Sequence, residues 1–570
     1  MILKTGAGLL PDAESMGFIG YYLDFLPEWG IINIICHESG TIHTEVHPMK
    51  LNYKRTILVG FAFFLICAFW QVYDVTIAMT LTSKFGMSQT ASGVVMALDN
   101  ILALFMLPLF GGISDRCRSK SGRRTPFIRT GTILAVTFLM LLSLADNAQL
   151  KKIQDYAPVN DPDTMERIYD EQKDATLKTP EGVEFKLADL YTREEFAQLT
   201  TNSTARELNS FGREVEVNLY TRHVVPARQA CAAAVTEQNP VTLILFLAIL
   251  LMLLISMATF RTPAVALMPD VTLKPLRSKA NAVINLMGNA GGIIVLAIGS
   301  VLAISKVRNA YMSYTGVYAI VGGIMLAALA IFLLTVKEPK WVAQMQETSI
   351  ALGLDKAEEV TQSGEKKKLS KGELRSLIFL LASIVLWFFG YNAVTSKYTV
   401  YAQNVLDKDA TTTLLLANVA AIISYLPVGM VASKIGRKKT ILAGITMLFT
   451  AFFVGCFLNA SSPDWLMTAM FILAGMAWAT INVNSFPMVV EMCSGADVGK
   501  YTGFYYTASM AAQSLTPTIS GIFMDKVAMT TLFPYAAIFV GLAFFTMLNV
   551  KHGDSRAEAK KGLEALDIDD

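Results

Sequence analysis

Two acidic side chains lie inside long apolar stretches of the sequence, where a carboxylate is costly to keep. Asp99 stands near the middle of an apolar stretch at 90–112, and Asp74 stands in the later part of another at 56–81. An ionisable side chain at the centre of a membrane costs about 2.5–3.5 kcal/mol or more, so its presence there indicates a function. A carboxylate that meets water alternately from each side of a membrane can load and release a proton, or bind sodium with oxygen partners. We expect Asp99 first, and Asp74 second, to bind a coupling ion. A structural hydrogen bond to a neighbouring helix is the alternative for each.

Aromatic and amide side chains accompany these carboxylates and could bind a solute. Trp70 precedes Asp74 by one helical turn, so the two would share a face, and Trp387 and Tyr391 are spaced in the same way, so they would form one aromatic surface. Aromatic rings can pack against the C–H faces of a sugar, while amides and carboxylates bond its hydroxyl groups. The candidate substrate-binding residues are Trp70, Gln71, Tyr73, Asn100, Asn289, Trp387, Tyr391, Asn392, Lys397, Asn418, Asn484 and Gln513. Taken singly, each amide is also a common packing residue.

Several kinds of chemistry are excluded by what the sequence lacks. It has no GxxxxGK[ST] phosphate loop, which argues against ATP as the energy source. All five histidines lie outside the apolar stretches, and no two of the six cysteines stand at CxxC spacing. Cys36, His37, His43 and His47 stand close together, but we expect no metal there. The sequence therefore predicts no cofactor, no metal and no catalytic residue, as in a protein that is not an enzyme.

The elements that must position these residues are membrane-spanning helices. The chain of 570 residues is 53% hydrophobic and 16% charged, whereas a soluble domain carries about 25% charged residues. A spanning helix needs about 20 mostly apolar residues. Such stretches occur at 56–81, 90–112, 127–147, 241–262, 280–304, 311–336, 376–400, 411–434, 439–459, 464–490, 501–523 and 531–550. The sequence therefore predicts an all-α membrane protein of twelve transmembrane helices in two pseudo-symmetric six-helix bundles.

Basic residues orient these helices, because cytoplasmic loops carry an excess of Lys and Arg. They concentrate in the second-to-third, fourth-to-fifth and eighth-to-ninth connections and in the central linker, whereas the short outer loops offer few, among them Lys84. We expect a monomer in the plasma membrane with both termini in the cytoplasm. The expected segments are a cytoplasmic N-terminal segment at 1–54, whose first 48 residues read as an extension, helices 1–3 at 55–147, an extracytoplasmic insertion at 148–240, helices 4–6 at 241–336, a cytoplasmic linker at 337–375, helices 7–12 at 376–550 and a cytoplasmic tail at 551–570. The insertion is either a small folded cap or a loosely structured decoration.

A glycine-rich basic motif occurs at the same place in both halves, after the second and the eighth helix. Such internal repeats are typical of secondary transporters. Glycine lets two helices approach closely, and Asp115 can pair with guanidinium groups or with the positive amino end of another helix, which makes a releasable latch. Ser433 replaces this carboxylate in the second half, so we expect a weaker latch there. Arg261 and Asp270 bracket the predicted inner end of helix four. The candidate gating residues are Gly111, Asp115, Arg116, Gly122, Arg123, Arg124, Arg261, Asp270, Gly429, Lys434, Gly436, Arg437 and Glu491.

The first of these motifs carries a family resemblance. The segment from Gly111 to Phe127, GGISDRCRSKSGRRTPF, resembles the corresponding segment of plant sucrose/proton symporters, with Thr125 in place of a third arginine. RTPAVALMPD from Arg261 and VKEP from Val336 are similar to the same branch and to glycoside–pentoside–hexuronide cation symporters. The resemblance covers about 55–340 well and the second half mainly by topology, and it omits the insertion. It implies the major facilitator fold and a sugar as the solute.

We therefore expect a secondary active transporter that works by alternating access and moves a sugar or glycoside with a proton or sodium. The resemblance favours the proton. A carrier or exporter of another small organic solute is one alternative. A non-transporting membrane sensor, with a ligand-binding insertion, is another, although a sensor needs neither latch motifs nor intramembrane carboxylates. The expected partners are the solute, the coupling ion and the lipid bilayer, and no nucleic acid.

Overall fold

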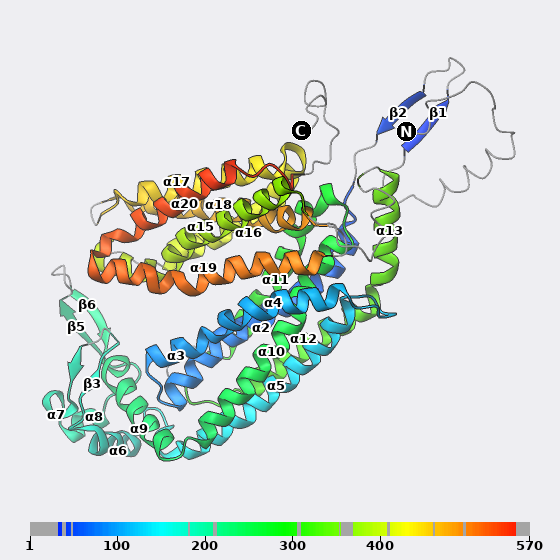
Figure 1. Cartoon of the computed structure of the whole chain (residues 1–570). Helices are drawn as coiled ribbons and strands as arrows, with labels where there is room; N and C mark the ends of the chain where they lie inside the picture. The colour runs from blue at the N-terminus through cyan, green and yellow to red at the C-terminus, as the bar shows by residue number, and fades with distance from the viewer. Residues whose placement is uncertain are drawn as a thin grey trace.

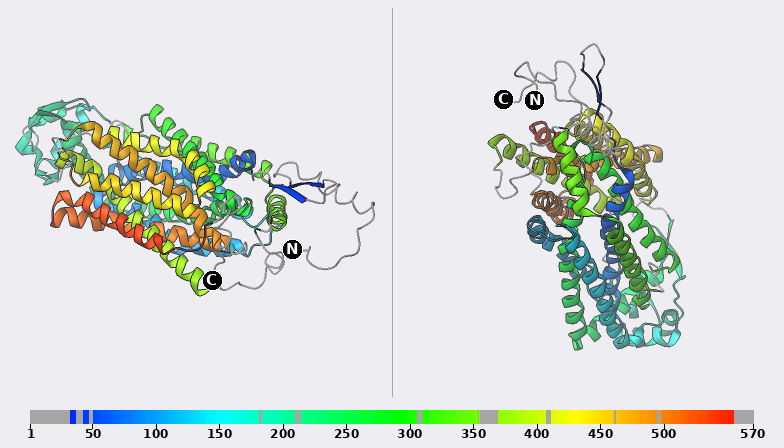
Figure 2. Two further views of the ribbon diagram at one scale, coloured as in Figure 1. Left: turned by 90° about the horizontal axis from the view of Figure 1, so that it is seen from above. Right: turned by 90° about the vertical axis from the view of Figure 1, so that its right-hand side faces the viewer.

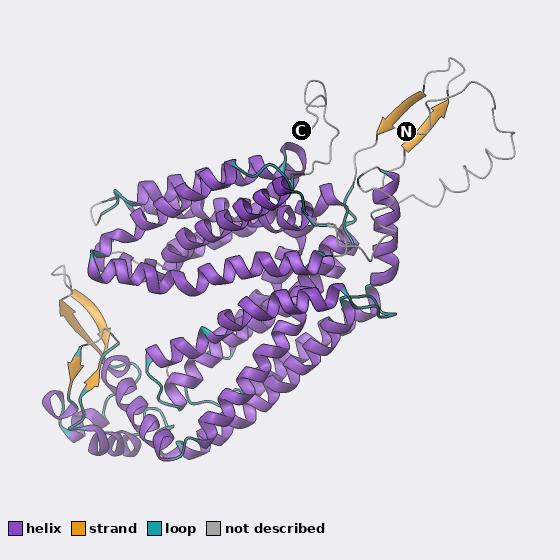
Figure 3. Ribbon diagram, in the orientation of Figure 1, coloured by secondary structure: helices purple, strands orange, loops and turns teal. Residues whose placement is uncertain are grey.

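The protein is nearly all helical in a computed structural model that describes residues 32–36, 42–46, 50–180, 183–208, 214–304, 309–352, 354, 369–406, 411–459, 462–493 and 497–554 (Figures 1 and 3). Most of the expected N-terminal extension, with His37 and His47, therefore lies outside the described residues. The same holds for most of the central linker and for the tail from residue 555.

Twelve helical segments have the length of a membrane span. In the first half these are α2 (Tyr53–Met79) with the π-helix η1 (Thr80–Lys84), α3 (Gln89–Met96) with α4 (Leu98–Asp115), α5 (Thr125–Lys152), α10 (Val241–Asp270), α11 (Arg277–Val301) and α12 (Thr315–Thr335). In the second half they are α15 (Lys371–Tyr401) with the π-helix η6 (Ala402–Leu406), α16 (Thr411–Ile435), α17 (Arg437–Gly455), α18 (Asp464–Glu491), α19 (Val498–Lys526) and α20 (Leu532–Leu548). Within the described ranges, 11 of these are apolar enough to cross a membrane by composition. The more polar α19, with 29 residues, completes the predicted set, and the all-α fold is confirmed.

The helices form two bundles, one from each half of the chain (Figure 1). In the first bundle α2 packs on α11 and α12, and α5 packs on α10 and α12. In the second, α18 packs on α16 and α17, while α15 packs on α19 and α20. The bundles meet along two seams, α4 against α19 and α11 against α16. We call the end that carries both glycine-rich motifs the motif end, and the opposite end the cap end.

The largest difference from the predicted helix boundaries is at the end of α10. Helix α10 does not end near residue 262 but continues through Pro263 to Asp270. Proline usually disrupts a helix interior, but in a membrane helix neighbouring groups can satisfy the backbone that it frees. Arg261 therefore lies nine residues, or about 14 Å at 1.5 Å per residue, from the inner end where the sequence prediction placed it.

The insertion is a folded cap. It contains α6 (Pro162–Gln172), β3 (Leu177–Lys178), β4 (Glu184–Phe185), α7 (Leu187–Leu190), α8 (Arg193–Ala197), the hairpin β5–β6 (Thr204–Leu208 and Glu214–Asn218), the π-helix η3 (Tyr220–Val224) and α9 (Val225–Gln238). Met165, Ile168, Leu187 and Phe196 form its fully buried core. The Cys231 thiol lies in this core and is not part of a disulfide, and burial raises its pKa to about 12.

The cap is fastened to the first bundle at three points. Gly86 has a φ of +67°, and a Cβ added to it would lie 2.2 Å from the backbone nitrogen of Ala233 in α9. Gln149 of α5 donates to the Thr236 hydroxyl of α9 at 3.0 Å. Arg228 donates to backbone carbonyls of the cap and lies over the ring of Tyr311, 5.4 Å from its centroid. The cap and α13 (Glu338–Ala351) are at opposite ends of the molecule (Figures 1 and 2).

The described strands are confined to the periphery (Figure 3). Besides the pairs β3–β4 and β5–β6 of the cap, an antiparallel hairpin joins β1 (Ile32–Cys36) to β2 (Ile42–Val46) before the first membrane helix. Neither sheet system enters the bundles, because strands with open edges cannot satisfy their backbone groups in lipid.

Candidate functional site

Arg261 is the centre of a charged and aromatic cluster where the two bundles meet. Its guanidinium lies 5.2 Å from the ring centroid of Trp70 in α2 and 5.1 Å from that of Tyr506 in α19. Cation–π contacts of this kind contribute about 2 kcal/mol when they are desolvated. The buried Nε of Arg261 has no hydrogen-bond partner among the described residues. The helix α10 thus places a cation between one aromatic ring from each half.

Both predicted coupling carboxylates belong to this cluster. Asp99 lies within electrostatic range of Arg261, and Asp74 and the phenol of Tyr73 lie within range of Asp99, while no ion pair among the described residues joins Arg261 to either carboxylate. Asp99 is half-buried at the start of α4, whereas Asp74 on α2 is exposed. The buried Tyr73 hydroxyl has no hydrogen-bond partner among the described residues. One cation and two carboxylates therefore share a site in which some polar atoms are unpaired.

A second polar group joins the bundles along the α11–α16 seam. Tyr425 of α16 hydrogen-bonds with Asn289 of α11 and with Asn482 of α18. The Tyr505 hydroxyl of α19 donates to the Asn482 side chain at 3.2 Å. Asn281 of α11 donates to the backbone carbonyl of residue 483 at 2.8 Å. Of these residues only Asn289 was a predicted substrate ligand; the tyrosines were missed because a single sequence does not tell a seam residue from a core residue.

Helix α15 does not present the aromatic surface that the sequence predicted. Trp387 is 0% exposed in the core of the second bundle, so the prediction that it stacks together with Tyr391 on one surface is wrong. Tyr391 instead stacks on Trp478 of α18, with the ring centroids 3.8 Å apart and the planes at 6°. The two residues are one turn apart, but Trp387 is enclosed in the main hydrophobic core, whereas Tyr391 is only partly buried against it.

Tyr391 and Asn418 line a cavity of ≈ 240 Å³ in the second bundle. The remaining predicted ligands are scattered. Asn100 and Gln513 are half-buried, the first beside Asp99 and the second on α19. Gln71 faces Gly292 of α11, and Lys397 lies against Gly521 of α19. Asn392 has a buried amide nitrogen without a partner among the described residues, whereas Asn484 is fully buried and donates to the backbone of its own helix. The Oδ1 atom of Asn484 is buried without a partner among the described residues.

The motif end is closed by Asp115 at the end of α4. Its carboxylate accepts hydrogen bonds from the backbone nitrogens of Gly499 and Lys500, both at 2.8 Å, in the first turn of α19. Such a carboxylate satisfies free N–H groups and interacts favourably with the helix dipole. Arg124 pairs with the same carboxylate at 2.5 Å and with Asp270 at 2.8 Å. Asp115 thus has both kinds of partner that the sequence suggested.

The first motif has a further anion that the sequence analysis did not select. Glu338, at the start of α13 (Glu338–Ala351), accepts from the backbone nitrogens of Arg123, Arg124 and Thr125 at 2.7, 2.9 and 2.8 Å. Gly122 adopts a φ of +106°, and a Cβ added there would lie 2.3 Å from the Glu338 carboxylate. The conspicuous VKEP segment contained this residue, but only the fold brings it to the start of α5.

The second motif closes the same end with different residues. Ser433 donates only to Met430 of its own helix, at 2.8 Å, so it does not replace Asp115 as a link between bundles. Glu491 at the end of α18 instead pairs with Arg437 at 2.9 Å and with Arg277 of α11 at 3.4 Å, and Arg437 donates to the Ser278 hydroxyl at 3.0 Å. The expectation of a weaker second latch considered only Ser433 and missed these links.

The glycines of both motifs differ in what they contact. A Cβ on Gly111 would lie 2.2 Å from the carbonyl oxygen of Gly499, and one on Gly429 would lie 3.2 Å from the carbonyl oxygen of Ser278. Gly436 has a φ of +95°, which matches the positive φ of Gly122 in the first motif. Arg116 and Lys434 are exposed beside the network. The two motifs therefore bring α4 to α19 and α16 to α11.

These contacts close the molecule at one end. Within the described part of the chain, hydrogen bonds between the bundles run from the motif end only as far as Thr507–Leu104 and Asn289–Tyr425.

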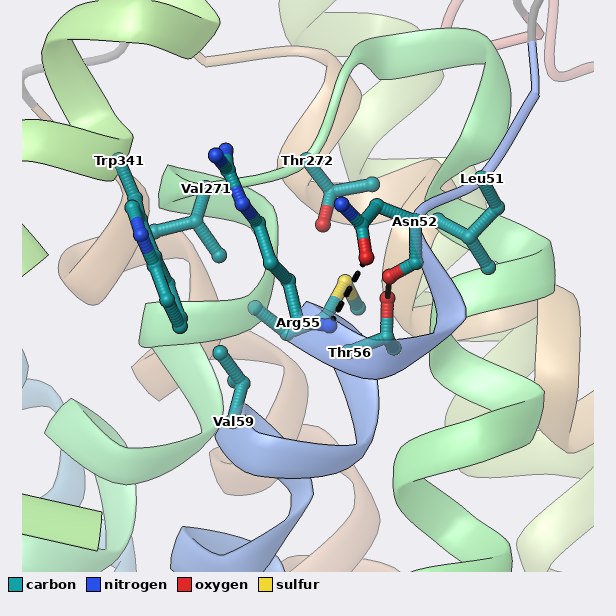
Figure 4. Close-up of a pocket in the computed structure, with 9 residues that line it drawn as sticks. Leu51, Asn52, Arg55, Thr56, Val59, Val271, Thr272 and Trp341 are labelled. Atoms are coloured by element: carbon teal, nitrogen blue, oxygen red, sulfur yellow. Dashed lines mark hydrogen bonds between the residues drawn. The ribbon is translucent and has the colours of Figure 1, made fainter. Parts of the chain in front are cut away.

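A small pocket at the motif end lies between Arg55, which stacks on Trp341 at 5.3 Å, and Asn52 (Figure 4). Its free volume of ≈ 10 Å³ is about what one water molecule needs, so this pocket is too small for a solute and is a gap between packed side chains.

The cap end contains a buried ion pair. Lys84 does not lie in an outer loop, as its position in the sequence suggests, but is fully buried in η1 and pairs with the equally buried Asp146 of α5 at 2.7 Å. Its ammonium group also donates to the carbonyl of Met312 at 2.7 Å and lies 4.0 Å from the ring centroid of Tyr314. Asp146 stood inside the apolar stretch 127–147, and that was the signal that could have found it.

The chain is similar to known proteins in sequence family and in fold. A family model described as Major Facilitator Superfamily matches residues 227–425 and 410–567, and one described as MFS/sugar transport protein matches residues 58–150. No curated protein sequence matches.

Three solved structures illustrate the likeness in fold. The proton:xylose symporter XylE, bound to 6-bromo-6-deoxy-D-glucose, has a TM-score of 0.52 at 14% identity and covers 90% of this chain and 98% of its own. The fucose:proton symporter FucP of E. coli has a TM-score of 0.53 at 11% identity, covering 88% and 100%. A bacterial homologue of the iron transporter ferroportin in its outward-facing state has a TM-score of 0.55 at 11% identity, covering 87% and 99%. At these identities the likeness shows the fold alone.

Proposed function

This chain belongs to the major facilitator superfamily, and we propose that within it the chain is a symporter that moves a sugar or glycoside together with a proton or sodium. The chain is a multi-pass membrane transporter and not an enzyme. The family resemblance of the GGISDRC…GRRTPF segment and the sugar symporters among its neighbours in fold support the solute class.

The observation that carries the proposal is the cluster of Asp99, Asp74 and Arg261 between Trp70 and Tyr506. A lone cation in a membrane is costly, and so are two carboxylates, so the three are retained for function. Protonation of Asp99, or binding of sodium to it, neutralises the negative charge near Arg261. Because Arg261 contacts an aromatic ring from each bundle, a change in its electrostatic surroundings can change the relative position of the bundles.

The motif end supplies the gate for this cycle. We place it in the cytoplasm, with both termini there, because its loops hold most of the basic residues. Two contacts hold this end closed: Asp115 accepts hydrogen bonds from the first turn of α19, and Glu491 pairs with Arg277. The solute would therefore enter from the cap end. Release of these contacts, after solute and ion have bound, would let the bundles rock to the opposite state. We place the chain in the plasma membrane as a monomer.

The test is uptake into proteoliposomes against a panel of sugars and glycosides, with an imposed pH gradient or an imposed sodium gradient. We expect one gradient to drive accumulation of a panel member. In Asp99→Asn, accumulation should fall to the equilibrium level, because the ion is no longer bound, while solute exchange without a gradient persists. Exchange is measured with labelled solute on both sides.

Two outcomes count against parts of this proposal, and a third identifies the coupling ion. If no panel member moves under either gradient, the sugar assignment is wrong, and a carrier or exporter of another small organic solute or a sensor takes its place. If Asp99→Asn accumulates solute as the parent does, Asp99 is not the coupling residue, and Asp74→Asn is the next variant to measure. If a second, sodium-free preparation still accumulates solute under a pH gradient, sodium is excluded as the coupling ion.

A further inference from the structure

The second bundle contains a cavity that the coupling cluster does not use. It lies among α15, α16, α17 and α18 and has a volume of ≈ 240 Å³. An apolar cavity of about 150 Å³ holds a benzene ring, so this one has room for an aromatic ring with substituents. Its lining residues are Tyr391, Val394, Thr395, Leu414, Ala417, Asn418, Phe452, Phe471, Ala474 and Gly475.

Three of the ten residues that line this cavity carry a polar side-chain group, namely Tyr391, Thr395 and Asn418. The other seven, among them the buried Val394, Phe471 and Ala474, offer no polar side-chain atom. The Thr395 hydroxyl already donates to a carbonyl of its own helix at 3.2 Å. A sugar ring in the depth of the cavity would leave several hydroxyls without a partner, and each unpaired group reduces affinity by about 5- to 150-fold. The cavity therefore selects an apolar group.

The charged groups of the central site are all on the opposite half. Asp74, Asp99 and Arg261 come from α2, α4 and α10, and no described residue that lines the cavity carries a charge. Tyr391 at the cavity lies near Tyr425, and Tyr425 bonds Asn289 of α11, so the cavity adjoins the seam between the bundles. A solute held at this seam would meet charged groups on the side of the first bundle and a ring-sized, mostly apolar recess on the other. We infer that the solute is a glycoside whose aryl or short alkyl aglycone enters the cavity while its sugar faces the first bundle. This inference rests on the proposed function.

Aromatic side chains next to the cavity provide a binding signal that does not depend on transport. Tyr391, which lines the cavity, stacks on Trp478 at 3.8 Å. A nitrophenyl group in the cavity would quench the fluorescence of Trp478. We expect p-nitrophenyl β-D-glucopyranoside or the matching galactopyranoside to quench the purified full-length protein saturably. Most of that quenching should disappear in Trp478→Phe.

The transport test compares phenyl with methyl glycosides of the same sugar in proteoliposomes. Burial of the phenyl ring should lower KM for the phenyl compound by about 10- to 100-fold. Ala474→Leu fills part of the cavity and should bring the ratio of the two KM values to within about threefold of one. Ala469→Leu makes the same change five residues earlier in α18, outside the cavity lining, and should preserve the ratio. Size-exclusion profiles show whether each variant folds, and Leu414→Trp is the second filling variant.

The outcomes separate the inference from the function on which it rests. Equal KM values for phenyl and methyl glycosides in the parent protein, or a ratio that Ala474→Leu and Leu414→Trp leave unchanged, would overturn the aglycone site while the transport of sugars stands. Quenching that Trp478→Phe does not reduce would overturn it as well. If no glycoside and no sugar is transported or bound, the proposed function itself fails.

Discussion

Lys84 and Asp146 show how much a single pair of residues can hold together in this protein. Both side chains are 0% exposed, and the pair joins η1, α5 and the segment before α12. The hydroxyl of Thr80 and the backbone of Tyr314 also bond the carboxylate, so the pair has its hydrogen bonds satisfied. Such a pair is strongly destabilising when only one partner is lost, because the other charge is left buried and alone.

We therefore expect Lys84→Met to lower the free energy of unfolding by about 3–5 kcal/mol. Asp146→Leu alone should do the same, while the double variant should recover part of the loss. The measurement is thermal unfolding of the detergent-solubilised protein. Lys151→Met, at an exposed site on α5, is the control and should unfold like the parent. A double variant as unstable as the sum of both single variants would contradict a coupled pair.

At the scale of elements, the approach of α4 to α19 decides how firmly the motif end is closed. Gly111 and Gly499 touch backbone to backbone, and Asp115 accepts hydrogen bonds from the first turn of α19. Neighbouring Gly112 has no atom within 4 Å of an added Cβ. The two adjacent glycines of one motif thus offer a matched comparison.

We expect Gly111→Ala to push α4 and α19 apart at the motif end and to populate the state open at that end. Alkylation of a single cysteine introduced at Thr502, which is 0% exposed near the start of α19, reports this opening in a background without the native cysteines. The rate should rise at least about threefold over the parent in Gly111→Ala. Gly112→Ala should leave the rate unchanged, and a similar rise in both variants would show that helix propensity rather than close contact is responsible.

At the scale of the whole molecule, the cap belongs to one bundle. Gly86, Gln149 and Arg228 attach it to the first half, and all three contacts lie at the cap end, where the described hydrogen bonds no longer join the bundles. If the bundles rock against each other, the cap should travel with the first bundle as one body.

Spin labels can test this movement. A pair at Asp163 of the cap and Gly316 of α12 should keep its distance when solute and gradient are added. A pair at Asp163 and Trp465 of α18, on the second bundle, should change its distance distribution. Both measurements use pulsed electron paramagnetic resonance in a background without native cysteines. A change in the first pair with none in the second would contradict attachment to the first bundle.

Much of this architecture is already determined by the sequence. Each apolar stretch has the length that a helix needs to cross a membrane, so the twelve helices can be predicted from local composition alone. The repeated motif places Asp115 and Ser433 at corresponding helix ends, since a duplicated sequence folds into duplicated halves. Asp99 and Asp74 stand out for the same local reason, because a charge within an apolar stretch is visible without the fold.

Only the tertiary structure decides which residues face one another. Pro263 does not end α10, so Arg261 lies well inside the membrane between Trp70 and Tyr506 rather than at the gate. Trp387 is buried although its spacing suggested a binding surface. Glu338 reaches the start of α5 across a gap of more than 200 residues in sequence. Local composition cannot fix these contacts, because lipid and protein interior are equally apolar and only helix packing distinguishes a core face from one that lines the solute path.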